Sequence, residues 1–178
     1  MSLFDLTGHV AIVTGGNGGI GLGMALGLAK AGASLAIVGR NADKNKIAIE
    51  KLQGMGATAI AIEKDITEEL AGTDVVTKVE DRFGRIDILI NNAGSNIRKR
   101  PEELSLNDFR WVQDTNLTSA FVFSQAVYPK FKTIGKGKII NIGSMYSIFG
   151  GAVATAYSVS KGGLIQMTKS MAAAWAAD

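Results

Sequence analysis

Short apolar segments alternate with longer amphipathic ones along the chain. The short segments are rich in Val, Ile and Ala, and each is almost continuously apolar. Such segments are typical of strands buried on both faces, as in parallel sheets that helices cover on both sides. The pattern predicts strands at His9–Thr14, Ser34–Val38, Thr58–Ile62, Ile86–Ile90 and Lys138–Ile142.

The longer segments have the spacing of amphipathic helices. In the first of them Leu22, Leu26 and Ala29 recur on one helical face, as expected of a helix that packs on a sheet. Strands that alternate with helices are typical of βαβ units, so we expect an α/β fold with a doubly wound parallel sheet. The predicted helices are Gly19–Lys30, Asp43–Met55, Glu68–Phe83 and Leu106–Phe131, with a last one within Ala154–Ala177.

The composition excludes several kinds of chemistry. The 178 residues include no Cys and a single His, His9. Without Cys there is no disulfide framework, no thiolate zinc site and no thiol nucleophile. A single His argues against a His-based metal site and against a Ser-His-Asp triad. We therefore expect no metal site.

The charge balance is mildly basic, with a formal net charge of +3 at pH 7. This balance suits an anionic ligand, but most basic residues are scattered and no aromatic platform accompanies them, so we expect no nucleic-acid partner. No apolar run approaches the roughly 18 residues of a membrane span. The first residues, Met1–Asp5, lack the features of a signal peptide. The sequence predicts a cytoplasmic protein without a membrane partner.

Glycine is frequent, with 22 of the 178 residues, against an average usage of roughly 7%. Several glycines fall in Thr14–Gly21, between the first predicted strand and its helix. Glycines let a backbone come close to a ligand, and a helix N-terminus offers free N–H groups to a pyrophosphate. Gly16, Gly18 and Gly21 fit the G-x-G-x-x-G pattern of dinucleotide-binding loops. The alternative is a tight turn that binds no ligand.

The same loop also fits T-G-x-x-x-G-x-G, and here the chain resembles the short-chain dehydrogenase/reductase family. The resemblance implies a Rossmann-like sheet with strand order 3-2-1-4-5. It also implies an oxidoreductase that transfers a hydride between a nicotinamide cofactor and a carbonyl or secondary alcohol. Further family motifs follow in order, each at a boundary of a predicted element: Asp65-Ile66, Asn91-Asn92-Ala93-Gly94, Asn116, Ser144 and Tyr157-x-x-x-Lys161.

Tyr157 and Lys161 are four residues apart, so they share one face of the last predicted helix. A free tyrosine has a pKa near 10, and an ammonium within about 4–6 Å favours the phenolate. Such a tyrosine can pass a proton to or from a substrate oxygen while a hydride moves at carbon. By resemblance Tyr157 is the acid/base, and Lys161 assists it and binds the nicotinamide ribose. Ser144 would hydrogen-bond the substrate oxygen, and Asn116 would support a water that leads protons to Lys161.

The resemblance also implies which residues hold the cofactor. The dinucleotide would lie against the glycine-rich loop, the ends of the second and third strands, the turn after the fourth, and the Tyr-Lys pair. Asn91 is expected to tie neighbouring strands together instead. The implied cofactor residues are Gly15, Asn17, Gly18, Gly19, Ile20, Arg40, Asp65, Ile66, Asn92, Ala93, Gly94, Tyr157 and Lys161.

The end of the second predicted strand bears on the choice of cofactor. Enzymes that use NAD usually have an acid there to hold the ribose 2′-hydroxyl, whereas this chain has Gly39-Arg40-Asn41. Without a carboxylate to repel a 2′-phosphate, and with Arg40 to bind it, the sequence favours NADP over NAD. If Arg40 instead stacks on the adenine, NAD stays compatible.

A basic cluster, Arg98-Lys99-Arg100, follows the turn after the fourth strand. Together with the stretch Ser144–Ser147, this cluster resembles the gluconate 5-dehydrogenase and 2-deoxygluconate 3-dehydrogenase branch of the family. The resemblance implies a sugar-acid substrate contacted by Arg98, Ser144 and Met145, since an Arg can bind its carboxylate. A solvated charge run is the alternative interpretation, and a 3-oxoacyl compound or a simple ketone is the alternative substrate.

Family members are usually longer than this chain. We therefore expect residues 1–178 to form a single dinucleotide-binding domain that lacks the family's C-terminal third, with its last strands. The parent protein would be an active reductase, and these 178 residues alone would be inactive. A noncatalytic nucleotide-binding or assembly module is the alternative. The resemblance also implies a homodimer or homotetramer, to which the small residues Ala172–Ala174 of the last helix could contribute.

Overall fold

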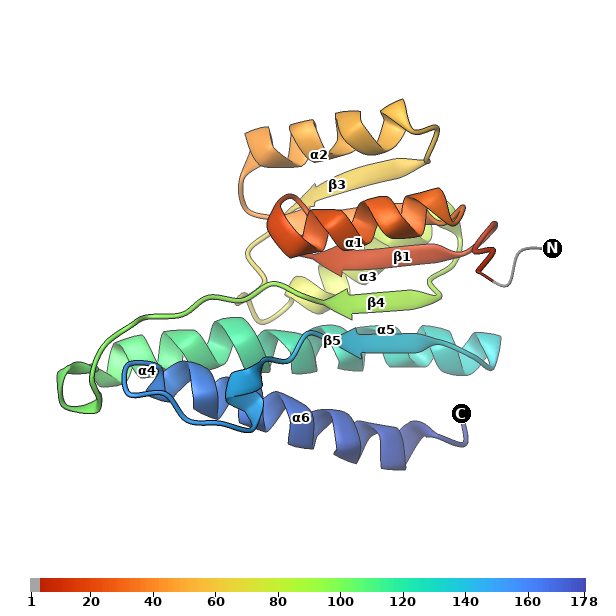
Figure 1. The fold of residues 1–178 in the computed structure, drawn as a ribbon. Helices are drawn as coiled ribbons and strands as arrows, with labels where there is room; N and C mark the ends of the chain where they lie inside the picture. Colours follow the sequence, from red (N-terminus) through yellow and green to blue (C-terminus); the bar gives the residue numbers. More distant parts are fainter. Residues whose placement is uncertain (1–3) are drawn as a thin grey trace.

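The computed structural model describes residues 4–178. The strands of this part of the chain form one parallel sheet in the order β3-β2-β1-β4-β5 (Figure 1). The predicted α/β fold and its strand order 3-2-1-4-5 are confirmed. The strands are β1 (Val10–Thr14), β2 (Ser34–Gly39), β3 (Ala59–Glu63), β4 (Ile88–Asn91) and β5 (Lys138–Asn141).

Helices connect the strands, and two 3₁₀ turns, η1 (Pro101–Glu103) and η3 (Met145–Ser147), lie in loops. The predicted helix Leu106–Phe131 is continuous from α4 to α5 and runs on to Ile134, but its middle, η2 (Asp114–Thr118), is π-helical. The helices are α1 (Gly19–Lys30), α2 (Ala42–Gly54), α3 (Ala71–Phe83), α4 (Leu106–Gln113), α5 (Ser119–Ile134) and α6 (Thr155–Trp175).

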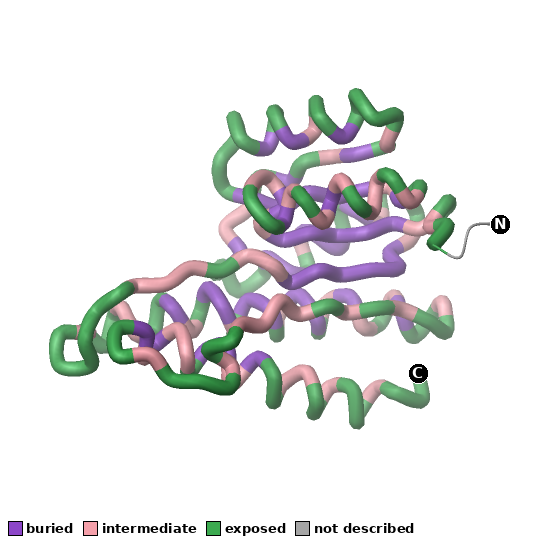
Figure 2. The backbone as a smooth tube through the Cα atoms, in the orientation of Figure 1, coloured by how far each residue is buried: buried purple, intermediate pink, exposed green. Residues whose placement is uncertain are grey.

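The two faces of the sheet carry separate cores. Val10 and Ile12 of β1 pack with residues of α3 and α5 on one face, whereas Ala11 and Val13 pack with residues of α1 and α2 on the other. Every residue of β1 and β4 is buried, as Figure 2 shows, and in β2 only Ser34 is partly exposed. Each fully buried Val or Ile contributes about 1.5–3 kcal/mol to folding. The sheet is therefore a rigid frame for the loops at its carboxyl end.

The outer elements, β5 and α6, are less buried than the centre of the sheet. β5 pairs with β4 alone, and its Ile140 is 46% exposed. α6 buries residues only in its first half, where it packs on α4, η2 and η3. Among residues 4–178, no helix combines the length and the apolar character needed to cross a membrane.

Asn91, the last residue of β4, joins three elements. Its Nδ2 lies 2.8 Å from Oδ1 of Asn141 on β5 and 3.1 Å from Oγ of Ser124 on α5. The residue is buried, so these bonds fix the spacing of β4, β5 and α5. The prediction that Asn91 ties neighbouring strands together is confirmed.

Candidate active site

A cavity of about 470 Å³ lies at the carboxyl ends of the strands. The strand order changes direction there, between β1 and β4, which is where open α/β sheets bind ligands. Of the residues predicted to hold a cofactor, Gly19, Tyr157 and Lys161 do not line the cavity. Those that line it are Gly15, Asn17, Gly18, Ile20, Arg40, Asp65, Ile66, Asn92, Ala93 and Gly94.

The glycine-rich loop after β1 has the close backbone packing that its glycines predict. Gly15 and Gly19 have positive φ angles of 62° and 51°, which residues with a side chain rarely adopt. A Cβ on Gly21 would lie 2.5 Å from Nδ2 of Asn92 and even closer to the carbonyl oxygen of Gly15. Gly18 is the N-cap of α1 and makes no side-chain cap bond. The first N–H groups of α1 therefore remain available to an anion.

Thr14 and Asn92 lock this loop to the turn after β4. Oγ1 of Thr14 accepts hydrogen bonds from the backbone N–H groups of Asn92 (3.0 Å) and Ala93 (3.1 Å). Nδ2 of Asn92 donates in return to the backbone carbonyl of Thr14 (3.0 Å). Two walls of the cavity are thus held at a fixed distance before any ligand binds.

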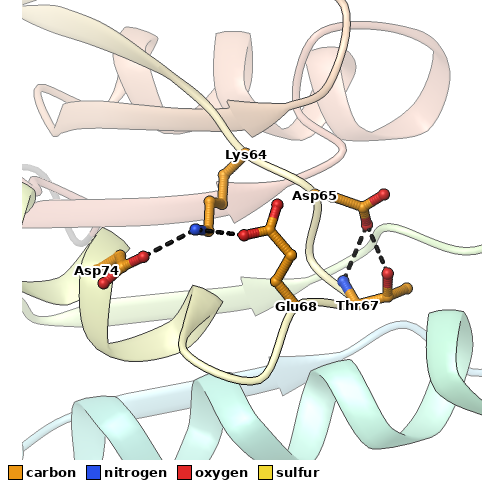
Figure 3. A network of polar contacts seen from close by, with 5 residues as sticks. All are labelled: Lys64, Asp65, Thr67, Glu68 and Asp74. Carbon is orange, nitrogen blue, oxygen red and sulfur yellow. Dashed lines mark hydrogen bonds and ion pairs between the residues drawn. The ribbon is translucent and has the colours of Figure 1, made fainter.

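Arg40 and Asp65 form an ion pair across the cavity, with 3.5 Å between Nη1 and Oδ2. Asp65 also accepts from the N–H (3.0 Å) and the hydroxyl (2.8 Å) of Thr67 (Figure 3). Partial burial opposes ionisation of Asp65, but these hydrogen bonds and the guanidinium of Arg40 hold its pKa below the usual value. The ends of β2 and β3 are therefore linked by charge at the position predicted for the adenosine part of the cofactor.

A second network fastens the loop after β3 to α3. Nζ of Lys64 lies 2.6 Å from Oε2 of Glu68 and 2.8 Å from Oδ2 of Asp74 (Figure 3). Hydrogen bonds to Asp74 and Glu68 raise the pKa of Lys64. Glu68 lies in the turn before α3, so the helix begins at Ala71 rather than at the predicted Glu68.

Lys161 is buried on α6 with Tyr157 one turn before it. Nζ of Lys161 lies 5.8 Å from the centre of the Tyr157 ring and donates to the carbonyl of Ile142 at 2.7 Å. Burial lowers the pKa of Lys161. A Cβ on Gly94 would lie 3.7 Å from Nζ of Lys161 and 3.1 Å from Oδ1 of Asn116. The Tyr-Lys pair therefore adjoins the wall of the cavity at Gly94.

Asn116 lies in the π-helical segment and binds both the turn after β4 and helix α6. Its Nδ2 donates to the carbonyl of Ser95 (2.8 Å) and to Oγ of Ser160 (3.0 Å). Its Oδ1 accepts from the N–H of Ser95 at 2.7 Å. Both amide protons are thus used by the protein, and Asn116 holds the turn after β4 against α6.

Ser144 precedes η3 and caps it. Its Oγ accepts from the N–H of Tyr146 at 3.2 Å, and the ring of Tyr146 meets that of Tyr157 edge-on, with 6.0 Å between centres and 87° between planes. Met145 is 68% exposed. The sequence alone assigns no role to Tyr146. Its position two residues after Ser144 is the one signal that could have placed this aromatic ring beside Tyr157.

The basic cluster lies beside the start of α6. An isolated bridge pairs Lys99 with Ala154, the N-cap of α6. Lys99 is bound to Asp108 (2.7 Å) and Arg100 to Glu102 (2.6 Å). Arg98 is exposed and makes no ion pair with the described residues.

The family model of the short chain dehydrogenases matches residues 9–178. The chain is 39% identical over 177 residues to 2-dehydro-3-deoxy-D-gluconate 5-dehydrogenase of Formosa agariphila, covering 99% of this chain and 67% of that protein. It is also 39% identical over 173 residues to gluconate 5-dehydrogenase of Gluconobacter oxydans, covering 97% and 68%. The chain therefore belongs to the short-chain dehydrogenase family, whose members are NAD(P)-dependent oxidoreductases.

Solved structures agree with this assignment. The chain matches an NAD⁺-bound xylitol dehydrogenase with a TM-score of 0.93 at 34% identity, covering 98% of this chain and 67% of that one. It matches a 7α-hydroxysteroid dehydrogenase complexed with NADH and a 7-oxo bile acid conjugate with a TM-score of 0.94 at 33% identity, covering 97% and 68%. Both similarities extend over nearly the whole chain, so the fold and the family are established together.

Proposed function

We propose that the protein transfers a hydride between a nicotinamide cofactor and a secondary alcohol or its carbonyl form, with Tyr157 as the acid/base. The observation that carries this proposal is the buried Lys161, whose Nζ lies 5.8 Å from the centre of the Tyr157 ring. Gly94 connects this pair to the cavity, because it lines the cavity and a Cβ built on it would lie within 4 Å of both Lys161 and Asn116. The group that transfers the proton would then lie next to the bound nicotinamide.

The cavity fits a dinucleotide because it lies at the carboxyl ends of the strands, where the glycine loop leaves the N-terminus of α1 uncapped by a side chain. When bound, the nicotinamide supplies or accepts the hydride. Gly15, Asn17, Gly18, Gly19 and Ile20 would hold the phosphates and the adjoining ribose at the N-terminus of α1. The adenine would lie near Asp65 and Ile66, the nicotinamide near Asn92, Ala93 and Gly94, and its ribose near Tyr157 and Lys161.

In the reduction direction, the phenol of Tyr157 donates a proton to the substrate oxygen as the carbonyl carbon gains the hydride. In oxidation the phenolate takes that proton back. The hydroxyl of Ser144 would donate a hydrogen bond to the same oxygen, and Lys161 would assist Tyr157 from the next turn of α6. Asn116 would support a water that leads protons to Lys161.

Two features support a preference for NADP. Gly39 ends β2 without the carboxylate that usually binds the ribose 2′-hydroxyl in NAD enzymes. Arg40 follows it at the cavity wall and can bind a 2′-phosphate. Binding of the phosphate would compete with the Arg40–Asp65 ion pair, which is long at 3.5 Å and partly exposed and therefore weak.

A sugar acid is the proposed substrate. Two of the relatives named above are a 2-dehydro-3-deoxy-D-gluconate 5-dehydrogenase and a gluconate 5-dehydrogenase, and both of the sugar acids in these names carry a carboxylate. Arg98 is the one member of the basic cluster without an ion pair to a described residue, and Lys99 connects the cluster to the start of α6. Arg98 would bind the carboxylate, and Met145 would line the substrate cleft.

The exposed surface of α6 is also compatible with the proposed homodimer or homotetramer. Val159 and Ile165 are exposed apolar residues of this helix, and Ala172–Ala174 are exposed as well. Sedimentation at micromolar concentration should show an assembly larger than one chain. A monomer would contradict this part of the proposal.

The decisive experiment, on the naturally expressed protein, compares NADPH and NADH as hydride donors with oxo sugar acids, 3-oxoacyl compounds and simple ketones. We expect turnover with an oxo sugar acid and NADPH, followed as loss of the reduced cofactor. Turnover with another class of carbonyl compound would support the proposed hydride transfer but contradict the proposed sugar-acid substrate. Cofactor binding without turnover of any substrate would instead indicate a noncatalytic nucleotide-binding module.

A further inference from the structure

Asn45 on α2 is a buried polar residue next to the cofactor cavity, with 3% of its surface exposed. Its Nδ2 donates to the backbone carbonyl of Gly39 at 2.9 Å. Its Oδ1 accepts from Nδ2 of Asn17 at 2.7 Å. These bonds connect the end of β2, through α2, to the glycine-rich loop after β1. No sequence motif singles out Asn45.

The chemistry of the three groups determines how both amides are turned. The Gly39 carbonyl can only accept, so Asn45 must present Nδ2 to it. Oδ1 of Asn45 then faces the loop, and Asn17 must present its own Nδ2. An apolar or carboxylate side chain at position 45 satisfies at most one of these two neighbours. The amide of Asn45 is therefore specifically required at this position.

The amides of Asn17 and Asn45 occupy the space that a side chain at position 39 would need. A Cβ on Gly39 would lie under 3.0 Å from the amide of Asn17 and 2.9 Å from Oδ1 of Asn45. Any side chain at position 39 must displace Asn17, which breaks its bond to Asn45 and leaves the buried Oδ1 unpaired. An Asp at position 39 would also bring a negative charge close to that oxygen, which adds repulsion.

We infer that Asn45 is a positioning residue for the cofactor loop, and that the Asn17–Asn45 pair determines whether an acid at position 39 can select NAD. This inference rests on the proposed dinucleotide-binding function. An acid at the end of β2 usually favours NAD by itself. Here the space for that acid is occupied, so cofactor choice at position 39 depends on Asn17.

The first test replaces Asn45. Asn45→Ala should weaken binding of NADH and NADPH alike by about 10-fold, as expected for the loss of one buried hydrogen-bonding side chain. KM for the cofactor should rise while kcat at saturating cofactor stays unchanged. Asn45→Asp should bind as weakly, because its carboxylate repels the Gly39 carbonyl. Lys46→Ala, an exposed neighbour on α2, is the matched control. Wild-type affinity in either Asn45 variant would overturn the positioning role.

The second test is a double-mutant cycle with fluorescence titration of both cofactors. Gly39→Asp alone should bind NADH and NADPH about 10-fold more weakly. Asn17→Ala alone should weaken both cofactors, because it removes the same bond to Asn45. In the Gly39→Asp background it should cause no further loss of NADH affinity, because the carboxylate gains the space of the Asn17 amide, so the two effects are not additive. Additive effects, or tight NADH binding by Gly39→Asp alone, would overturn the inference.

Thermal unfolding of each variant separates lost affinity from lost structure. If Gly39→Asp does not fold, the Asn45 variants decide the question by the split between KM and kcat. A wild-type protein that binds neither cofactor would instead overturn the proposed function itself. Failure of the inference and failure of the function are thus distinguishable.

Discussion

Nζ of Lys161 is held by a backbone carbonyl, that of Ile142 at 2.7 Å, and lies 5.8 Å from the centre of the Tyr157 ring. No described carboxylate forms an ion pair with Lys161. A carbonyl orients an ammonium without neutralising it and favours the charged form, whereas burial lowers the pKa of Lys161 and opposes that charge. The sheet and α6 together therefore support the proposed acid/base role of Tyr157.

Tyr157→Phe tests that role directly. The phenylalanine keeps the ring but cannot transfer a proton, so turnover should fall by about 100-fold to 10,000-fold. Cofactor affinity should change little, because most of the predicted cofactor residues lie elsewhere. Steady-state kinetics and fluorescence titration of the naturally expressed protein measure the two quantities. Tyr128→Phe is the matched control, since Tyr128 stacks on Trp175 instead. Retained turnover in Tyr157→Phe would refute the assignment.

Arg98→Ala tests the proposed carboxylate contact. KM for an oxo sugar acid should rise about 10-fold or more, because a charge-assisted hydrogen bond is lost. KM for an uncharged ketone should not change. Arg100→Ala removes a similar charge that is already paired with Glu102, and it should leave both values near wild type. Equal effects of the two variants would favour a solvated charge run over a substrate contact.

The sequence predicts the fold well because β1 and β4 are buried along their whole length and β2 from Leu35 onward, which produces continuous apolar runs. The glycine loop is predicted because close backbone packing, as at Gly21, requires glycine, and glycines are read directly from the sequence. The π-helical segment at Asp114–Thr118 is not predicted, because such a segment is a local change of backbone hydrogen bonding that no particular residue type marks. The Tyr146–Tyr157 and Asn17–Asn45 contacts join segments distant along the chain, and only the fold reveals them.

Arg40→Ala tests the cofactor preference. If Arg40 binds a 2′-phosphate, the affinity for NADPH should fall about 10-fold while that for NADH is unchanged. Fluorescence titration with both reduced cofactors measures the difference. Arg110→Ala removes an exposed arginine on α4 and should change neither affinity. An equal loss for both cofactors would indicate that Arg40 stacks on the adenine instead.

Asp87 predicts a pH dependence of stability. The residue is buried, and its Oδ2 accepts from the N–H of Val10 and from Nε of Arg85, each at 2.9 Å. Burial opposes ionisation, but Arg85 and Val10 hold the pKa of Asp87 below its usual value. Asp87 therefore binds a proton less readily when folded than when unfolded. Its contribution is fully present above the unfolded pKa of about 3.9 and is lost as the pH falls through the lower folded value.

Asp87→Asn should accordingly lower the free energy of unfolding by about 1–3 kcal/mol at pH 7, with a smaller difference near pH 3. Urea unfolding across that pH range measures the change. Asp81→Asn on the exposed side of α3 is the control and should shift stability little at any pH. A difference between Asp87→Asn and wild type that stays constant with pH would contradict the role of the charge.

Gly21 and Gly23 lie two residues apart on α1 but differ in their surroundings. A Cβ on Gly21 would overlap the Gly15 carbonyl and lie 2.5 Å from Asn92, whereas a Cβ on Gly23 would meet nothing within 4 Å. Gly21→Ala should therefore destabilise the fold by about 1–3 kcal/mol, as overpacking does, and should also weaken cofactor binding by displacing the loop. Gly23→Ala should stabilise the fold by about 0.5–1 kcal/mol, because alanine loses less backbone entropy in a helix. Thermal unfolding and cofactor titration of both variants measure these effects. A Gly21→Ala protein as stable as Gly23→Ala would contradict the prediction, because the loop would then have moved to make room for the methyl group.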